Sequence, residues 1–332
     1  MKKEYFKKLK IFLFIVIVGL VVYVFRNQFP PIFKEMKNTS LRTLFLIALM
    51  GAMYQFFDGL SLREVAKSLG ENSISVFDSW GCSLYSAFYR VITFGSATYL
   101  SIIYYFKRMN VDESKGFSIS TLNYMAQRIA VVITASFMYI ANRSFMIKYF
   151  SKWINYLLLG ILFTFIVVLV LILICVSEKF HKLIIYLFKF DKKNRLEDFK
   201  NKLQDKLFMV RSGTRDLLLN KGLIVKITIL NILKMFCWFL IPCIIFHNQY
   251  NYTNFDYISV TALAIALIGV IPAPGAMGST EFVFGLLFSV LMDVNKAMSG
   301  MFLYRFGNFI VPTVLGALIA VYLRIKESKL KE

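Results

Sequence analysis

The chain has few of the residues and motifs from which metal sites and enzyme active sites are built. Its 332 residues include only two histidines and four cysteines. His181 and His247 stand alone, and the cysteines lie in apolar stretches without a Cys-x-x-Cys pair, which is typical of buried, reduced thiols. No Walker A motif, Gly-rich nucleotide fingerprint, Gly-x-Ser-x-Gly elbow or Asp-rich cluster is present. We therefore expect no metal, no cofactor and no ATP-driven pumping.

Charge is scarce as well, since 17% of the residues are charged and 58% are hydrophobic, with a mean hydropathy of +0.63. This composition is typical of a polytopic membrane protein. The net charge of +20 then indicates basic cytoplasmic loops near anionic headgroups rather than nucleic-acid binding. We expect a single membrane domain, residues 1–332, in a bacterial cell membrane.

Hydropathy predicts an all-α integral membrane protein with about six full transmembrane helices and two re-entrant or tightly paired half-helix hairpins. The candidate spans are Ile11–Phe25, Leu41–Leu60, Phe117–Ile140, Ile154–Val176, Leu223–Phe246 and Met298–Leu323. Two further apolar regions, Ser75–Phe106 and Tyr257–Met292, are interrupted. Each is too long for one span of about 20 residues and too short for two comfortable ones.

The distribution of basic residues predicts the orientation. Both chain ends are rich in lysine, and the loop Ser177–Lys221 carries 12 Lys and Arg against 6 Asp and Glu, so all three are expected in the cytoplasm. The loop His247–Asp256 has no Lys or Arg and is expected outside. These assignments agree only if each interrupted region returns to the face from which it entered, as a re-entrant hairpin or as two tightly joined spans. The basic loop Asn142–Trp153 conflicts with its expected outside position.

Within residues 177–221, the segment Phe180–Phe190 alternates apolar and basic residues. It predicts an interfacial amphipathic helix, followed by a charged helix from Asp191 to about Met209. A solvated linker helix explains the same pattern equally well.

The second interrupted region contains a proline- and glycine-rich break, formed by Pro272, Pro274, Gly275 and Gly278. Broken backbone at membrane depth is tolerated where it is buried in protein or lines a wet cavity. One interrupted region lies in each half of the chain, which is the pattern expected where half-helices of two structural repeats meet at a binding site.

Polar residues inside apolar segments indicate where such a site lies. Ser79, Ser83, Ser86 and Arg90 form one stripe on a helix, and Arg90 either faces a cavity or extends to the interface.

A second stripe, Ser120, Asn123 and Gln127 with Arg128 and Tyr124 beside it, either lines the same cavity or joins helices through hydrogen bonds. In the span Leu223–Phe246, we expect Lys234 to reach the cytosolic interface.

The last span contains a Tyr304-Arg305 pair deep in apolar sequence, and Glu281 is the nearest acidic residue that could neutralise Arg305. This pair would be structural. Alternatively, Arg305 and Arg90 are both free to bind a phosphate, toward which a half-helix beginning near Ser279 would direct its backbone N–H groups.

The string Pro-x-Pro-Gly-x-x-Gly-x-x-Glu at residues 272–281, followed by Tyr304-Arg305 and Pro312, resembles the lysylphosphatidylglycerol synthase transmembrane region. This flippase-like family includes the membrane half of the bacterial multiple peptide resistance factor. The resemblance covers nearly the whole chain, but the first interrupted region lacks the usual proline and has Gly95-Ser96 in place of a glycine pair. Ala276 also stands where glycine is frequent.

The resemblance implies a translocator for an anionic or aminoacylated phospholipid or a polyprenyl-phosphate-linked lipid. The partners it implies are membrane lipids, with a separate lipid-modifying enzyme or self-association as further options. We expect the family's soluble aminoacyltransferase domain to be absent. The alternative is a phosphatidylglycerol lysyltransferase, or its membrane subunit with the catalytic domain supplied in trans. The candidate headgroup-binding residues are Arg90, Arg128, Ser279, Glu281, Tyr304 and Arg305.

Overall fold

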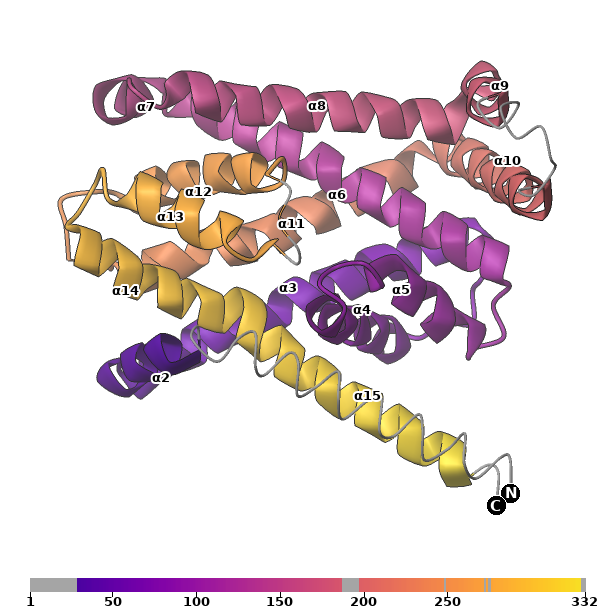
Figure 1. Ribbon diagram of the computed structural model, residues 1–332, viewed down its shortest axis with the longest axis horizontal. Coiled ribbons are helices and arrows are strands. Elements are labelled where there is room, and N and C mark those ends of the chain that lie inside the picture. The colour runs from indigo at the N-terminus through magenta and orange to yellow at the C-terminus, as the bar shows by residue number, and fades with distance from the viewer. Residues whose placement is uncertain (1–28, 187–196, 248, 272, 274–275, 330–332) are drawn as a thin grey trace.

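The computed structural model describes residues 29–186, 197–247, 249–271, 273 and 276–329, and all regular structure in these residues is helical (Figure 1). The expected first span, Ile11–Phe25, lies outside the described residues. So do Pro272, Pro274 and Gly275 of the predicted break.

Five long apolar helical segments are able by length and composition to cross a membrane, and they match the other five predicted spans, except that α11 ends one residue before Phe246. The last of them is a rod of two α-helices joined by one turn of π-helix. The segments are α3 (Leu41–Ser68), α6 (Glu113–Ala141), α8 (Ile154–Val176), α11 (Lys221–Ile245), and α14 (Val294–Arg305) with η3 (Phe306–Ile310) and α15 (Val311–Lys329).

Each interrupted region forms a hairpin of two shorter helices. The first consists of α4 (Val76–Ile92) and α5 (Thr98–Lys107), and the second of α12 (Asn254–Ile268) and α13 (Ser279–Phe288). At 1.5 Å per residue these helices are about 15–25 Å long, shorter than a bilayer core of about 30 Å. Both bends contain left-handed backbone, with φ values of 91° at Gly95 and 78° at Gly278.

The long helices hold the two hairpins on opposite sides of a central crossing of α3 and α11 (Figure 1). The hairpin helix α4 packs on α3 and on α15, and its counterpart α12 packs on α11 and on α6. Each half of the chain therefore contributes a long helix, a hairpin and a second long helix, and each hairpin contacts the last long helix of the other half. The open ends of the hairpins face opposite ends of the molecule.

Glycines allow two of these helix contacts to be very close. A methyl group added to Gly51 of α3 would lie 2.1 Å from the carbonyl oxygen of Gly307 in η3. The same change at Gly316 of α15 would place it 2.1 Å from the carbonyl oxygen of Leu84 in α4. Small residues at such contacts let helix backbones approach directly, which fixes the position of the first hairpin against the last helix.

Four shorter or more polar helices lie outside this arrangement: α2 (Phe29–Asn38), α7 (Arg143–Phe150), α9 (Glu178–Tyr186) and α10 (Glu197–Leu219). Helices α9 and α10 overlap the segments for which an amphipathic and a charged helix were expected, and α10 continues ten residues beyond Met209. Residues 187–196, where the charged helix was expected to begin, lie outside the described residues. Hydrogen bonds from Lys182 and Arg211 lower the pKa of Glu178, so these two helices are joined by an ion-pair cluster.

Candidate functional site

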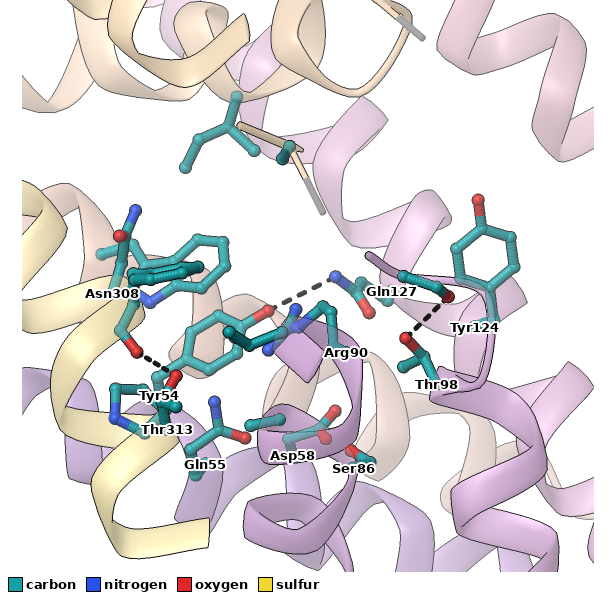
Figure 2. A pocket seen from close by; sticks show the side chains of 18 of the residues that line it. Tyr54, Gln55, Asp58, Ser86, Arg90, Thr98, Tyr124, Gln127, Asn308 and Thr313 are labelled. Atoms are coloured by element: carbon teal, nitrogen blue, oxygen red, sulfur yellow. Dashed lines mark hydrogen bonds between the residues drawn. The ribbon is translucent and has the colours of Figure 1, made fainter. Parts of the chain in front are cut away.

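A polar cavity of about 330 Å³ lies where the bends of the two hairpins come together (Figure 2). The first hairpin contributes five residues between Arg90 and Tyr99 to its wall, and the second contributes Ile265, Ile268, Ala276 and Thr280. Helices α3 and α6 and the π-helical turn complete the enclosure. This volume falls in the range of small-molecule sites, about 300–1,000 Å³.

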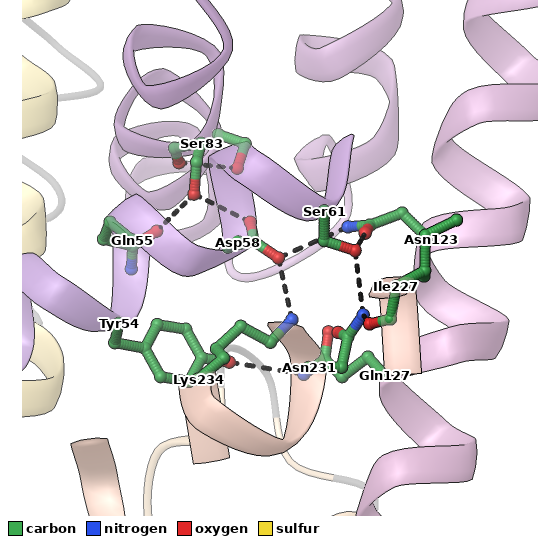
Figure 3. Close-up of polar contacts among 11 residues, drawn as sticks. Tyr54, Gln55, Asp58, Ser61, Ser83, Asn123, Gln127, Ile227, Asn231 and Lys234 are labelled. Carbon is green, nitrogen blue, oxygen red and sulfur yellow. Dashed lines mark hydrogen bonds and ion pairs between the residues drawn. The ribbon is translucent and has the colours of Figure 1, made fainter. Parts of the chain in front are cut away.

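A buried ion pair joins α3 to α11 beside the cavity, and its carboxylate, Asp58, is part of the cavity wall (Figure 3). The ammonium group of Lys234 lies 2.7 Å from Asp58 Oδ1, and the Lys234 side chain is fully buried. The expectation that Lys234 reaches the cytosolic interface is therefore wrong, because Asp58 supplies the counter-charge inside the protein. Asp58 was missed in the sequence, although a lone carboxylate in the apolar segment Leu41–Leu60 is itself a signal of a functional or paired group.

Hydrogen bonds extend from this ion pair to two further helices. Asp58 accepts from Asn123 at 3.3 Å, and Ser83 Oγ lies 2.7 Å from the other carboxylate oxygen. Ser61 donates to Asn123 at 2.6 Å and accepts from Asn231 at 2.8 Å. The network joins α3, α4, α6 and α11, so Asn123 connects helices. The residues of its stripe also line the cavity, and both readings of that stripe therefore hold.

A second ion pair fixes the other hairpin. The guanidinium of Arg305 donates to both carboxylate oxygens of Glu281, at 2.7 and 2.8 Å, and to the carbonyl oxygen of Ala276 at 2.8 Å. Glu281 also accepts from the backbone N–H of Gly278 at 2.8 Å, as part of a capping box at the start of α13. Of the two alternatives for Glu281 and Arg305, the geometry is that of a bidentate pair which holds the bend against α14.

Two other arginines lie at the cavity without such partners. Arg90, at the end of α4, and Arg128, in α6, both line it, and neither guanidinium group forms a hydrogen bond or ion pair with any described residue. Arg128 stacks over the ring of Tyr124 at 4.9 Å, and its buried Nε has no acceptor among the described residues. Guanidinium groups only donate hydrogen bonds, so both are available to an anion.

Two aromatic residues, Tyr54 and Trp238, line the cavity beside Asp58 of this ion pair. Tyr54 stacks on Trp238 with ring centroids 3.8 Å apart, and its hydroxyl accepts from Gln127 at 3.3 Å. The Lys234 ammonium lies 5.4 Å from the Tyr54 ring centre. Tyr54 and Trp238 were not among the sequence candidates, because aromatic residues are abundant throughout this chain.

Four of the six candidate residues line the cavity, and the other two lie behind its wall. Arg90, Arg128, Tyr304 and Arg305 line the cavity. Glu281 reaches it only through Arg305, and Ser279 is buried at the start of α13, where its hydroxyl has no partner among the described residues. Of the described residues at this bend, Ala276 and Thr280 line the cavity and Ser279 does not.

These features define a multi-pass helical membrane protein with a polar cavity between two helical hairpins. Residues 9–316 match the family described as lysylphosphatidylglycerol synthase TM region, and the chain belongs to this family, as its resemblance predicted. No curated protein and no solved structure gives a significant match.

Proposed function

We propose that this protein is a lipid translocator that binds the phosphate of a lipid headgroup in the central cavity. The observation that carries the proposal is the pair of guanidinium groups, Arg90 and Arg128, that face the cavity without a carboxylate partner among the described residues. A phosphate has several acceptor oxygens whose geometry suits guanidinium donors. Arg305 was one of the two expected phosphate ligands, but its pairing with Glu281 favours Arg128 in that role.

In this proposal the two hairpins are re-entrant and enter the membrane from opposite faces. The open end of α4–α5 lies at the same end of the molecule as the basic helices α9 and α10, which we assign to the cytoplasm (Figure 1). The open end of α12–α13 lies at the other end, beside the loop that has no Lys or Arg. With Ile11–Phe25 as a sixth span, both chain termini are cytoplasmic, in a bacterial cell membrane.

The cavity would lower the barrier to moving a charged headgroup across the bilayer. A charge in the hydrocarbon region costs several kcal/mol or more unless it is paired or hydrated. Arg90 and Arg128 would supply paired donors near mid-depth, while the acyl chains stay in the surrounding lipid. Broken helices meeting at the midplane are the arrangement that secondary transporters use for this purpose.

Transport in vesicles tests the proposal. The purified protein is reconstituted into liposomes with phosphatidylglycerol that carries a fluorophore on an acyl chain, and dithionite quenching reports lipid that reaches the outer leaflet. We expect Arg90→Gln to slow crossing at least about tenfold, a loss of about 1.4 kcal/mol of transition-state stabilisation. Arg143→Gln, an exposed arginine of α7, is the matched control and should leave the rate unchanged. Equal rates for Arg90→Gln and the control would refute the proposal.

The family's description names a synthase, and this favours a second hypothesis. The chain would be the membrane part of a phosphatidylglycerol lysyltransferase, with the catalytic domain supplied by a separate lipid-modifying enzyme. Incubation of the purified protein with phosphatidylglycerol and lysine-charged tRNA tests it. Lysylated lipid formed without a partner would establish an enzyme in this chain, and its formation only after a partner is added would establish the two-chain version.

A further inference from the structure

The charges around the cavity indicate which lipid headgroup the site prefers. We infer that the site selects a phosphate-terminated headgroup that carries no amino group, and that it discriminates against a cationic, aminoacylated headgroup. This inference rests on the proposed function, because it concerns the same cavity. Family membership leaves both anionic and aminoacylated lipids possible, and this inference favours the anionic ones.

An amino group on a headgroup would find no free carboxylate in the described part of the wall. Asp58 is the single carboxylate among the lining residues, and it already contacts Lys234, Asn123 and Ser83. Behind the wall, both oxygens of Glu281 accept hydrogen bonds from Arg305, and one of them accepts a further bond from Gly278. A lipid ammonium would have to displace Lys234 or Arg305, each of which is buried.

The unpaired charges around the cavity are positive, which also disfavours a cationic headgroup. Lys234 and Arg305 are neutralised by their partners, while Arg90 and Arg128 have no ion-pair partner among the described residues and, as like charges on one cavity wall, repel each other. Inside a protein such charges interact more strongly than in water, because the surroundings screen them less. An anion between Arg90 and Arg128 relieves this repulsion, whereas a second cation increases it.

The number of unpaired cations favours a phosphomonoester. A phosphomonoester has three acceptor oxygens and a charge of about −1.5 to −2 near neutral pH, which matches two guanidinium groups. A phosphodiester such as that of phosphatidylglycerol has one charge and two free oxygens. Phosphatidic acid and a polyprenyl phosphate share the monoester chemistry, so both are expected to bind better than phosphatidylglycerol, and lysylphosphatidylglycerol is expected to bind worst.

Competition binding tests this order without requiring transport. Fluorescent phosphatidic acid is bound to the purified full-length protein in a neutral detergent and displaced by unlabelled phosphatidic acid, polyprenyl phosphate, phosphatidylglycerol or lysylphosphatidylglycerol. We expect lysylphosphatidylglycerol to compete at least about tenfold more weakly than phosphatidylglycerol, the scale of about 1.4 kcal/mol. In Arg90→Gln/Arg128→Gln, this difference should fall below about twofold, while Arg143→Gln should retain it.

The outcomes distinguish this inference from the proposed function. Lysylphosphatidylglycerol competing as well as phosphatidylglycerol overturns the inference, and transport in vesicles can still hold. The expected order in detergent with no lipid crossing in vesicles supports the selectivity and refutes translocation. If phosphatidic acid competes but polyprenyl phosphate does not, or the reverse, the chain type also contributes to recognition. Failure of every lipid to bind refutes both.

Discussion

Arg128 and Arg305 hold comparable places in the two halves of the molecule, yet only one of them has a carboxylate partner. Each lies in the long helix that follows a hairpin, α6 after α4–α5 and α14 after α12–α13. The second hairpin places Glu281 in the first turn of α13, against Arg305. The first hairpin has no acidic residue in the first turn of α5, and Arg128 stacks on Tyr124 instead.

The difference separates a structural arginine from one available to a ligand. A bidentate, buried pair such as Arg305–Glu281 holds the bend in position, and losing one partner leaves an uncompensated charge. Arg128 retains a buried Nε donor that has no partner among the described residues, which is a cost to stability that a bound anion would offset. The two halves thus use the same arrangement of helices for different purposes.

The largest expected effect comes from breaking the structural pair. Glu281→Gln removes the charge that compensates the buried Arg305 and should lower the free energy of unfolding by about 3–5 kcal/mol. Denaturant unfolding of the detergent-solubilised protein measures it. Glu178→Gln, an exposed carboxylate of α9, is the control. A Glu281→Gln variant as stable as this control would show that Arg305 does not depend on Glu281.

The Asp58–Lys234 pair allows a second test of the same logic. Asp58→Asn keeps the side-chain shape but leaves a fully buried ammonium without a counter-charge, and should destabilise by about 2–4 kcal/mol. Adding Lys234→Met should recover most of this loss, since the buried charge is then gone. A double-mutant cycle on unfolding free energies gives the coupling, and a coupling near zero would contradict the paired arrangement.

A carboxylate placed beside Arg128 should make the first half resemble the second. Tyr99 lines the cavity and packs edge-on against Tyr124, over whose ring Arg128 stacks, so Tyr99→Glu brings an acidic group close to that arginine. We expect crossing of phosphatidylglycerol to slow about tenfold, equivalent to about 1.4 kcal/mol. Tyr99→Gln has the same size without the charge and is the control in the vesicle assay. Equal slowing by both variants would show that loss of the tyrosine, rather than neutralisation of Arg128, matters.

The smallest expected effect lies at the bend itself. Ala276 has φ of 58°, a left-handed conformation that costs a residue with a side chain about 1–2 kcal/mol relative to glycine. Replacing Ala276 by glycine removes this conformational cost, but part of the stabilisation is offset because glycine has more conformational freedom in the unfolded chain. Ala276→Gly should therefore stabilise the protein by about 1 kcal/mol or less, measured by denaturant unfolding. A loss of stability would mean that the alanine methyl group makes contacts that outweigh the backbone strain.

The sequence was sufficient for the long apolar helices and for one contact between residues close along the chain, but not for the short helices α2 and α7. Hydropathy predicted the bounds of α8 to the residue, because a membrane span requires a long uninterrupted apolar run. It located the two helical hairpins because their apolar regions are interrupted. The pairing of Glu281 with Arg305 was among the expected alternatives since only 24 residues separate them. The break near Gly278 was visible because glycine and proline end helices wherever they occur together.

Contacts between distant segments were not predictable in the same way. Asp58 and Lys234 are 176 residues apart, and their meeting depends on how α3 and α11 are rotated about their axes where they cross. Hydropathy does not fix that rotation, so Lys234 was assigned to the interface. The π-helical turn at Phe306–Ile310 was missed for a similar reason, because one extra residue in a turn leaves the apolar pattern almost unchanged.

One comparison of two double variants tests the central claim most directly. Glu281→Gln/Arg305→Gln removes both charges of the structural pair together, and Arg90→Gln/Arg128→Gln removes both unpaired guanidinium groups. Crossing of fluorescent phosphatidylglycerol in liposomes is measured for equal amounts of folded protein. We predict that the first variant keeps its rate within about threefold, since a pair removed as a unit leaves no buried charge, while the second loses at least about tenfold. The reverse result, with transport lost on removal of Glu281 and Arg305 but retained without Arg90 and Arg128, would contradict this account.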